Sequence, residues 1–377
     1  MKFEKYPFEK LNELLKGVVP NSAYEPVVLT IGEPQFETPG FIQDELKSNS
    51  SLLNKYPKSA GESWLKEAQI SFVKRRFGVE LNNQELIPTF GTREVLFNFP
   101  QFLLFDKKEP LIAYTNPFYQ IYEGAARMCR ARVLHLNLTK KNGFKPDLSE
   151  PRLKEADLVI LNFPNNPTSS TLSLEELKEW AKLALEYDFV LLNDECYSEI
   201  YVDKKPPSLL EASLEIGNES FKNILVINSI SKRSSAPGLR SGFIAGDSKI
   251  LEEYMKYRTY VGAAIPLPLQ RASAKAWQDE LHVKRSREIY AKNLSLASEI
   301  LGVKMPEATF YVWLEVKDEL EFTKKLYEKK NIKVLPGSFL GREGMGSAYV
   351  RIALVENSEK TEKVLNLIRE FMKEEGY

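Results

Sequence analysis

The chain of 377 residues has few of the residue types that mark disulfide-rich or metal-binding proteins. Its two cysteines, Cys129 and Cys196, are too few for a disulfide framework. Its two histidines, His135 and His282, lie far apart without ligand-like neighbours, so we expect no metal site. The charges balance, with 52 Lys and Arg against 52 Asp and Glu. This balance gives no overall field toward nucleic acid or a membrane surface, and we expect neither as a partner.

Long apolar runs are also missing. No uninterrupted apolar stretch approaches the ~20 residues that cross a bilayer, and residues 1–7 lack the apolar core of a signal peptide. We therefore expect a cytoplasmic protein whose cysteines are small buried fillers. The chain also lacks internal repeats and any Gly/Ser linker. Its length is large for one core and predicts two lobes.

Between about residues 85 and 265, short apolar runs alternate with amphipathic helical stretches. The runs are rich in Val, Ile and Leu and do not alternate strictly, as is typical of parallel strands covered on both faces. Ser173 and Glu176 form a capping box ahead of a helix over Leu174–Tyr187. The pattern predicts an α/β fold with a mostly parallel sheet and a site at the carboxyl ends of its strands. The predicted strands are Glu85–Phe90, Leu111–Asn116, Ala131–Leu138, Leu158–Phe163, Phe189–Asp194, Ile224–Ile230 and Gly242–Ala245.

The character of the sequence changes after about residue 270. A long charged stretch, Gln270–Leu301, predicts one continuous helix that joins the lobes. A smaller α+β lobe follows, with strands at Thr309–Val316 and Ala348–Leu354, a turn at Leu335–Ser338 and a helix near Lys360–Glu374. We expect residues 46–268 to form the large domain and residues 269–377 the small one, to which residues 1–45 contribute.

The segment 229–242 carries the most chemical information. The apolar run 224–228 ends in Ser229 and Ser231, which precede Lys232, and Arg240 follows eight residues later. A buried lysine tends to lose its proton and becomes an amine that forms Schiff bases with aldehydes. A single lysine after a strand is more often a solvated end residue, so the interpretation depends on the other motifs.

Those motifs follow other predicted strands. Asp194 and Tyr197 come at the end of one strand, and Asn166 lies in a proline-rich segment after another. Thr92 and Arg93 follow Gly91 at the start of a helical stretch, where backbone N–H groups and the helix dipole favour anions. Each motif also has a structural interpretation: Asp194 as a helix cap, or residues 162–168 as an ordinary turn.

Taken in order along the chain, the motifs resemble those of class I aminotransferases, which are pyridoxal phosphate (PLP) enzymes of fold type I. The resemblance implies a large domain with a mostly parallel central sheet, a smaller α+β domain and Lys232 as the catalytic residue that binds PLP covalently. Asp194 would keep the pyridine nitrogen protonated, while Tyr197 and Asn166 would bind the phenolic oxygen. The phosphate would be held by Thr92, Arg93, Ser229, Ser231 and Arg240, and Tyr119 would stack on the ring.

The resemblance also implies substrate contacts and a partner. Gly32, Asn166 and Arg351 would bind the substrate. Arg351 suits the substrate carboxylate, because the planar guanidinium of arginine binds carboxylates bidentately. An arginine at a strand edge that pairs with a surface acid is the structural alternative for Arg351. Tyr56 would reach the phosphate of a neighbouring subunit in a homodimer with shared sites. The chain departs from the family pattern at Gln35 and Ser169, where aspartate and glycine are usual.

Longer phrases are similar to those of N-succinyl-diaminopimelate aminotransferases, which act in the synthesis of meso-diaminopimelate and lysine with glutamate as the usual donor. These phrases cover residues 6–11, 116–125, 194–201, 231–243, 257–260 and 335–340. Such substrates carry carboxylates far from the reacting amine, so further cations should face the pocket. Arg93 and Arg233 are the candidates, with a structural ion pair as the alternative for each.

Other members of the family stay open as alternatives. An aspartate or aromatic aminotransferase, or a PLP-dependent carbon–sulfur lyase, would share nearly all of these motifs. PLP-binding transcriptional regulators would need a DNA-binding segment ahead of the motifs, and the matches here begin by residue 29.

Overall fold

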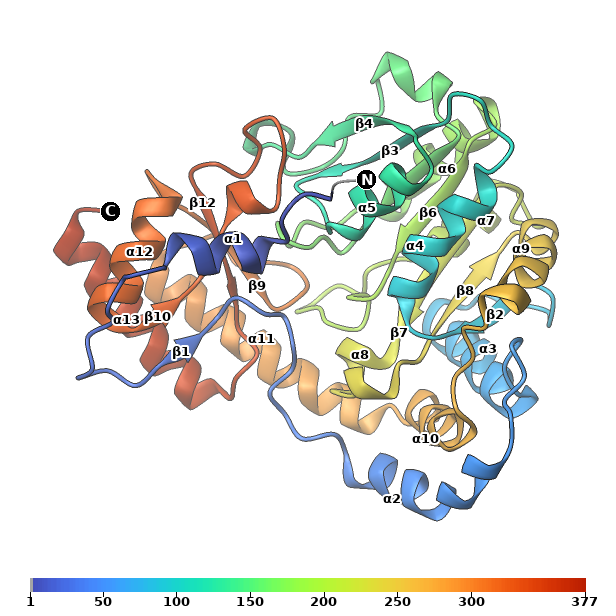
Figure 1. The fold of residues 1–377 in the computed structure, drawn as a ribbon, viewed down its shortest axis with the longest axis horizontal. Coiled ribbons are helices and arrows are strands. Elements are labelled where there is room, and N and C mark those ends of the chain that lie inside the picture. The colour runs from blue at the N-terminus through green and yellow to red at the C-terminus, as the bar shows by residue number, and fades with distance from the viewer. Residues whose placement is uncertain (1–2) are drawn as a thin grey trace.

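A seven-stranded sheet forms the centre of the larger lobe in the computed structural model, which describes residues 3–377 (Figure 1). The strand order is β2-β8-β7-β6-β5-β3-β4, and only β8 runs antiparallel to its neighbours. All seven predicted strands are present, with ends that differ by at most two residues. Their bounds are β2 Leu86–Thr89, β3 Leu111–Asn116, β4 Arg132–Asn137, β5 Leu158–Leu161, β6 Val190–Asp194, β7 Ile224–Ser229 and β8 Gly242–Gly246.

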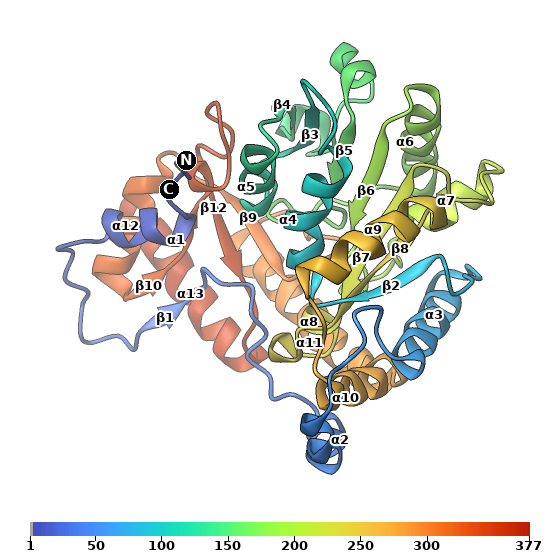
Figure 2. The ribbon, with the colours of Figure 1, turned by 45° about the vertical axis from the view of Figure 1, so that its right-hand side comes forward.

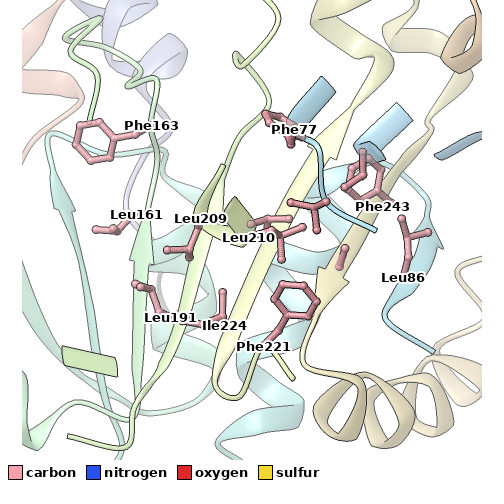
Figure 3. Packing of buried hydrophobic residues seen from close by; sticks show 14 of the residues in the cluster. Phe77, Leu86, Leu161, Phe163, Leu191, Leu209, Leu210, Phe221, Ile224 and Phe243 are labelled. Carbon is pink, nitrogen blue, oxygen red and sulfur yellow. The ribbon is translucent and has the colours of Figure 1, made fainter. Parts of the chain in front are cut away.

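Helices cover both faces of this sheet, so side chains of one strand enter two separate cores. Leu111 and Ala113 of β3 join one apolar cluster, while Ile112 and Tyr114 join the other. Figure 3 shows part of the first cluster, which α3 (Ser63–Phe77), α6 (Leu174–Glu186), α7 (Leu209–Glu215) and α10 (Leu267–Gln278) cover. The second cluster lies under α4 (Thr92–Leu103), α5 (Ile121–Met128) and α9 (Ser248–Val261). Two buried faces explain why the strands read as apolar runs.

The predicted capping box starts α6. The hydroxyl of Ser173 accepts a hydrogen bond from the Glu176 N–H at 3.2 Å, and the Glu176 carboxylate accepts one from the Ser173 N–H at 2.8 Å. Two N–H groups that lack helical partners are thereby satisfied.

The smaller lobe contains an antiparallel sheet in the order β11-β12-β9, with bounds Leu335–Pro336, Tyr349–Ala353 and Tyr311–Glu315. A two-stranded parallel pair joins β1 (Val27–Val28) to β10 (Ile332–Lys333), so the N-terminal segment lies in this lobe. Helices α1 (Pro7–Leu14), α12 (Glu319–Lys330) and α13 (Ser358–Glu375) surround these strands (Figure 2). Strands β9 and β12 and helix α13 agree with the sequence prediction, whereas β11 lies where a turn was predicted and β1, β10 and α12 were not predicted.

The predicted continuous helix over Gln270–Leu301 is wrong. Helix α10 ends at Gln278, and α11 begins at Leu281 and runs to Leu301. Asp279 has extended backbone angles, and its carboxylate accepts a hydrogen bond from the His282 N–H at 3.0 Å. A short polar side chain that bonds the backbone in this way competes with the continuation of a helix.

The break lies where the chain passes between the lobes. Helix α10 packs against α3 and α2 (Gly40–Ser48) of the large lobe, whereas α11 packs against α13 of the small lobe. The domain division at residue 268 stays a prediction, and these contacts favour a boundary at the break.

Candidate active site

A cavity of about 780 Å³ lies at the carboxyl ends of the parallel strands, and residues of the small lobe line it as well. This is the edge at which open α/β sheets bind ligands. All of the predicted site residues except Tyr56 line it: Gly32, Thr92, Arg93, Tyr119, Asn166, Asp194, Tyr197, Ser229, Ser231, Lys232, Arg240 and Arg351.

Lys232 lies on α8 (Ile230–Arg233), a single helical turn directly after β7. Its ammonium donates a hydrogen bond to the carbonyl oxygen of Gly32, and it lies 6.0 Å from the centre of the Phe310 ring. No carboxylate within residues 3–377 forms an ion pair with it. The amine is therefore held in the cavity by a neutral oxygen atom that a ligand can displace.

Asp194 ends β6, is buried and lines the cavity. Its carboxylate accepts a hydrogen bond from the Cys196 N–H at 3.1 Å. Burial raises the pKa of Asp194, while that hydrogen bond and the charge of Lys232 act in the other direction. A buried carboxylate with one backbone donor and no contacting cation suits a protonated ring nitrogen.

Hydroxyl groups and an arginine gather at the start of α4. Thr92 is the first residue of this helix, Ser229 ends β7 and Ser231 lies on α8. All three line the cavity together with Arg240. Gly91 has a φ of 73°, and a Cβ there would lie 2.2 Å from the Arg240 guanidinium. The glycine therefore lets Arg240 approach the helix start, where backbone N–H groups favour anions.

Arg240 has no acidic partner among residues 3–377. It donates to the carbonyl oxygens of Pro237 at 2.9 Å and Phe90 at 3.4 Å. Burial lowers its pKa, and the nearby charge of Arg93 adds to this effect. Two arginines close enough to repel each other mark a site for an anion.

Arg351 brings a further positive charge from β12 of the small lobe. It donates to the Asn166 side-chain oxygen at 2.7 Å and to the Thr30 carbonyl at 2.6 Å. Its buried Nε has no hydrogen-bond partner among the described residues. The side chain is held in place by neutral oxygens and keeps its charge for an anionic ligand.

Several residues that the sequence did not single out also line the cavity. Tyr311, Tyr122 and the N-terminal residues Tyr6 and Phe8 are among them. Tyr122 is fully buried with no hydrogen-bond partner for its hydroxyl among residues 3–377, and burial together with the charge of Asp194 raises its pKa. It lies three residues after Tyr119, a spacing that puts both side chains on one side of a helical turn, which is the signal that could have found it.

The prediction that the cysteines are buried is wrong for Cys129 and confirmed for Cys196. Cys129 is only half-buried. Cys196 is buried but also lines the cavity, and its thiol lies 3.4 Å from the Thr92 hydroxyl and 3.5 Å from the Ser229 hydroxyl. It is therefore part of the cavity wall.

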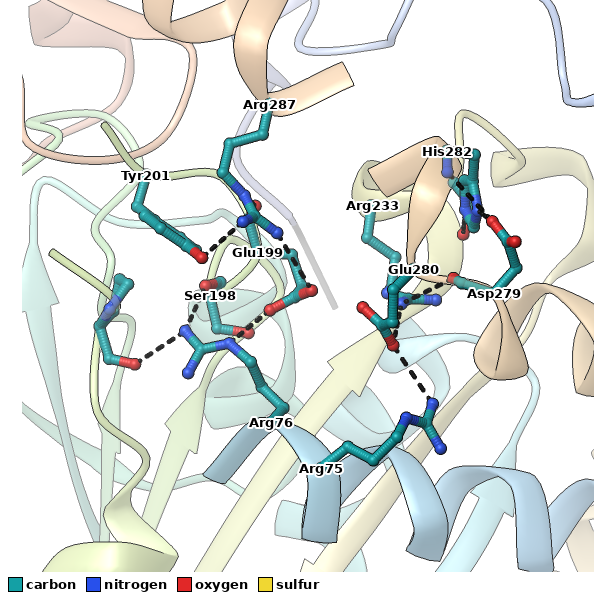
Figure 4. A network of polar contacts seen from close by, with 12 residues as sticks. Arg75, Arg76, Ser198, Glu199, Tyr201, Arg233, Asp279, Glu280, His282 and Arg287 are labelled. Atoms are coloured by element: carbon teal, nitrogen blue, oxygen red, sulfur yellow. Dashed lines mark hydrogen bonds and ion pairs between the residues drawn. The ribbon is translucent and has the colours of Figure 1, made fainter. Parts of the chain in front are cut away.

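Arg233 does not face the cavity, so its proposed contact with a distal carboxylate is wrong. The guanidinium lies 4.9 Å from the Phe72 ring centre and 5.1 Å from that of Trp277. It donates to the Ala276 carbonyl at 2.7 Å and to the Glu280 carboxylate at 3.2 Å (Figure 4). The structural alternative therefore holds for this residue.

Ser234 also binds the junction between α10 and α11. Its hydroxyl lies 2.9 Å from Nε2 of His282, whose Nδ1 lies 2.5 Å from the Asp279 carboxylate. Although the three residues have the order of a Ser-His-Asp triad, Ser234 is 1% exposed and does not line the cavity. The arrangement links α8, which carries Lys232, to the junction between the lobes.

Tyr56 is fully exposed on the surface of the larger lobe and does not line the cavity of its own chain. Among residues 3–377, no group of three or more His, Cys, Asp or Glu side chains is arranged to hold a metal ion. Nor is any helix in that range both long enough and apolar enough to cross a membrane.

Within the described part of the chain, the cavity contains a lysine without an ion pair, a buried acid and, at the start of α4, a cup of hydroxyl groups and arginine. On this α/β fold, such a cavity suits an enzyme that binds an anionic aldehyde cofactor. The chain matches the family model described as aminotransferase class I and II over residues 24–368 and belongs to that family. It is a PLP-dependent aminotransferase with the α/β fold of class I. The features of the cavity fit that cofactor, with Lys232 for the aldehyde, Asp194 for the ring nitrogen and the cup at α4 for the phosphate.

Three similar proteins put this membership in context. The crystal structure of aminotransferase AspB from Helicobacter pylori is 56% identical, has a TM-score of 0.97 and is matched over 99% of this chain and 100% of its own. The LL-diaminopimelate aminotransferase of Natranaerobius thermophilus is 32% identical, with 92% of each chain covered. The aspartate aminotransferase of Pyrococcus horikoshii is 30% identical over 97% of this chain and 95% of its own.

Proposed function

We propose that this aminotransferase moves an amino group from glutamate to N-succinyl-2-amino-6-oxopimelate in the synthesis of meso-diaminopimelate and lysine. The phrases of the sequence support this assignment, and LL-diaminopimelate aminotransferases are among its relatives. Relatives that carry other names, such as the aspartate aminotransferase, keep that substrate as the alternative. A PLP-dependent carbon–sulfur lyase is the other alternative.

The observation that carries the proposal is Arg93, which lines the cavity together with Arg240 and Arg351. Arg93 is exposed at the cavity wall and donates to the Tyr119 hydroxyl at 2.8 Å. No carboxylate within residues 3–377 pairs with it. We assign the phosphate to Arg240 and the hydroxyls near it, and the α-carboxylate to Arg351 of the other lobe. Arg93 is then available for a distal carboxylate, which glutamate and the succinylated acceptor both have, in place of the phosphate role that the family resemblance implies for it.

The roles proposed for the remaining residues follow from their positions. When bound, PLP supplies an aldehyde that amines attack and a ring that withdraws electrons. The Lys232 amine would bind this aldehyde and would carry the proton of the substrate Cα as general base and acid. Asp194 would hold the proton of the ring nitrogen, and Tyr197 and Asn166 would donate hydrogen bonds to the ring oxygen.

We also propose a homodimer in which Tyr56 reaches the phosphate of the partner subunit. Support comes from exposed apolar side chains on the larger lobe: Leu53 is 73% exposed, Tyr56 100%, Phe105 84% and Tyr260 93%. Large exposed apolar groups favour association.

Half-reaction spectroscopy tests the substrate assignment. Glutamate and N-succinyl-diaminopimelate should convert the visible absorbance of the cofactor-loaded enzyme, while aspartate should act slowly. Arg93→Gln should raise the concentrations of glutamate and N-succinyl-diaminopimelate needed for half-conversion about tenfold or more, since a charge-assisted hydrogen bond is lost. The concentration of alanine needed for half-conversion should not change, because alanine has no distal carboxylate. Arg152→Gln, which changes an exposed arginine outside the cavity, is the matched control. A response to aspartate as fast as that to glutamate would favour the alternative.

A further inference from the structure

Tyr311 of β9 touches the groups at both ends of the substrate site. Its hydroxyl lies 3.0 Å from that of Tyr197, and the Arg351 guanidinium lies 4.5 Å from the centre of its ring. A Cβ on Gly32 would lie 1.8 Å from the Tyr311 hydroxyl, so the backbone next to Lys232 passes directly over it. The side chain is 2% exposed and still lines the cavity.

Hydrogen bonds between the backbone of Tyr311 and the side chains of Ser169 and Thr309 hold this residue in place. The Ser169 hydroxyl of the large lobe donates to the Tyr311 carbonyl at 2.8 Å and lies 2.6 Å from the Thr309 hydroxyl. Thr309 accepts in turn from the Tyr311 N–H at 3.0 Å. Ser169 is one of the two departures from the family pattern, and here its hydroxyl fixes a strand of the other lobe.

The hydrogen atoms of the two hydroxyls can be accounted for. Tyr197 and Tyr311 have one hydroxyl hydrogen each, and a single hydrogen bond between them uses one. Neither hydroxyl has another hydrogen-bond partner among residues 3–377. One hydrogen therefore remains without an acceptor among these residues, and an anionic oxygen in the cavity that both side chains line can accept it.

We propose that Tyr311 is a positioning residue that donates its hydrogen to Tyr197 and so reserves the Tyr197 hydrogen for the oxygen of the bound cofactor ring. The direction of this bond rests on the proposed function, in which Tyr197 donates to that oxygen. If Tyr197 donates to the cofactor, only Tyr311 can supply the hydrogen between the two tyrosines.

A consequence for the bound cofactor follows. A hydroxyl that accepts a hydrogen bond becomes a stronger donor, because chains of hydrogen bonds polarise one another. Tyr311 thus strengthens the bond that stabilises the negative charge on the ring oxygen. We expect the visible absorption of the cofactor-loaded enzyme to change with pH. We also expect Tyr311 to lower the midpoint of this change below the value that Tyr197 alone would give.

Tyr311→Phe tests this directly, since the ring stays beneath Arg351 and only the hydroxyl is lost. A pH titration of the visible absorption band should give a midpoint about 0.5 to 1 pH unit higher than in the wild type. Tyr349→Phe is the matched control: Tyr349 lies on the neighbouring strand β12, stacks on Trp313 and does not line the cavity. This variant should keep the wild-type midpoint.

Three results would overturn the inference. An unchanged midpoint in Tyr311→Phe, with or without a lower melting temperature, would leave Tyr311 a structural role only. An equal shift in Tyr349→Phe would make the effect nonspecific. A wild-type protein without a pH-dependent visible band would remove the inference together with the residue roles on which it rests, whereas an unchanged variant midpoint in a normal wild-type background removes this inference alone.

Discussion

Arg351 extends into the cavity with two neutral hydrogen-bond partners and an unpartnered Nε. We predict that Arg351→Ala weakens amino acid binding by roughly 2–5 kcal/mol, the range for truncation of a buried charge pair. Arg351→Lys should restore only part of this loss, because lysine keeps the charge but not the planar pair of donors. Half-reaction titrations with glutamate measure both effects, and unchanged binding in both variants would contradict the role.

For single residues, the sequence predicts the cavity residues that belong to a family motif. It misses the cavity residues that lie outside every motif. Lys232, Asp194 and Asn166 follow predicted strands and line the cavity as expected. Tyr311 lies in a strand of alternating aromatic and aliphatic residues, a pattern typical of core packing. The sequence therefore gives no sign that Tyr311, unlike its neighbours, lines the cavity. For Arg233 the sequence leaves the cavity contact and the structural ion pair open, because the direction of a side chain on a single helical turn depends on packing that the sequence does not display.

The strands of the large lobe could be predicted closely because each is bounded by turns and all but the edge strand β4 consist wholly of buried residues. The break between α10 and α11 could not, since amphipathic periodicity continues across it. What ends the helix is local, namely the hydrogen bond from the His282 N–H to the Asp279 carboxylate. The short strands β1 and β10 were also missed, because two residues give no periodicity and their pairing spans about 300 positions.

The same junction gives a pH prediction. Burial lowers the pKa of His282, and the nearby charge of Arg233 acts in the same direction, against the hydrogen bond to Asp279. Because the folded pKa is below that of the unfolded chain, the unfolded state binds more protons as pH falls. The free energy of unfolding should therefore decrease as the pH falls below about 6.5, the ordinary histidine value.

His282→Gln isolates this contribution, because an amide can bond both Asp279 and Ser234 without titrating. Urea unfolding of both proteins between pH 5 and 7.5 measures the difference. The gap between wild type and variant should change most below pH 6.5. A gap that is constant over the whole range would contradict the assignment to His282.

For the whole molecule, the chain length predicts two lobes and the strand pattern predicts a site at the carboxyl ends of the parallel strands. The cavity lies at those ends, and residues of both lobes line it. The arrangement of subunits does not follow from one chain. Tyr56 is fully exposed, so its predicted role requires a partner.

A hybrid dimer tests that role. We predict that Tyr56→Ala and Lys232→Ala homodimers each have impaired sites, while a hybrid of the two variants has one intact site made from Lys232 of one subunit and Tyr56 of the other. The two variants, each with a different tag, can be co-expressed, and the hybrid can be purified through both tags. The hybrid should retain cofactor and activity at about half of the wild-type level, because one of its two sites is intact. A hybrid with no recovery would mean that Tyr56 acts within its own chain, and an unimpaired Tyr56→Ala homodimer would mean that Tyr56 does not act at all.

The most direct test of the central claim is borohydride reduction of the purified enzyme followed by peptide mass mapping. The account predicts one pyridoxyl group per chain, attached to Lys232, and its absence in Lys232→Ala. A pyridoxyl group on another lysine, or none on the wild-type chain, would contradict the assignment of this cavity as the cofactor site.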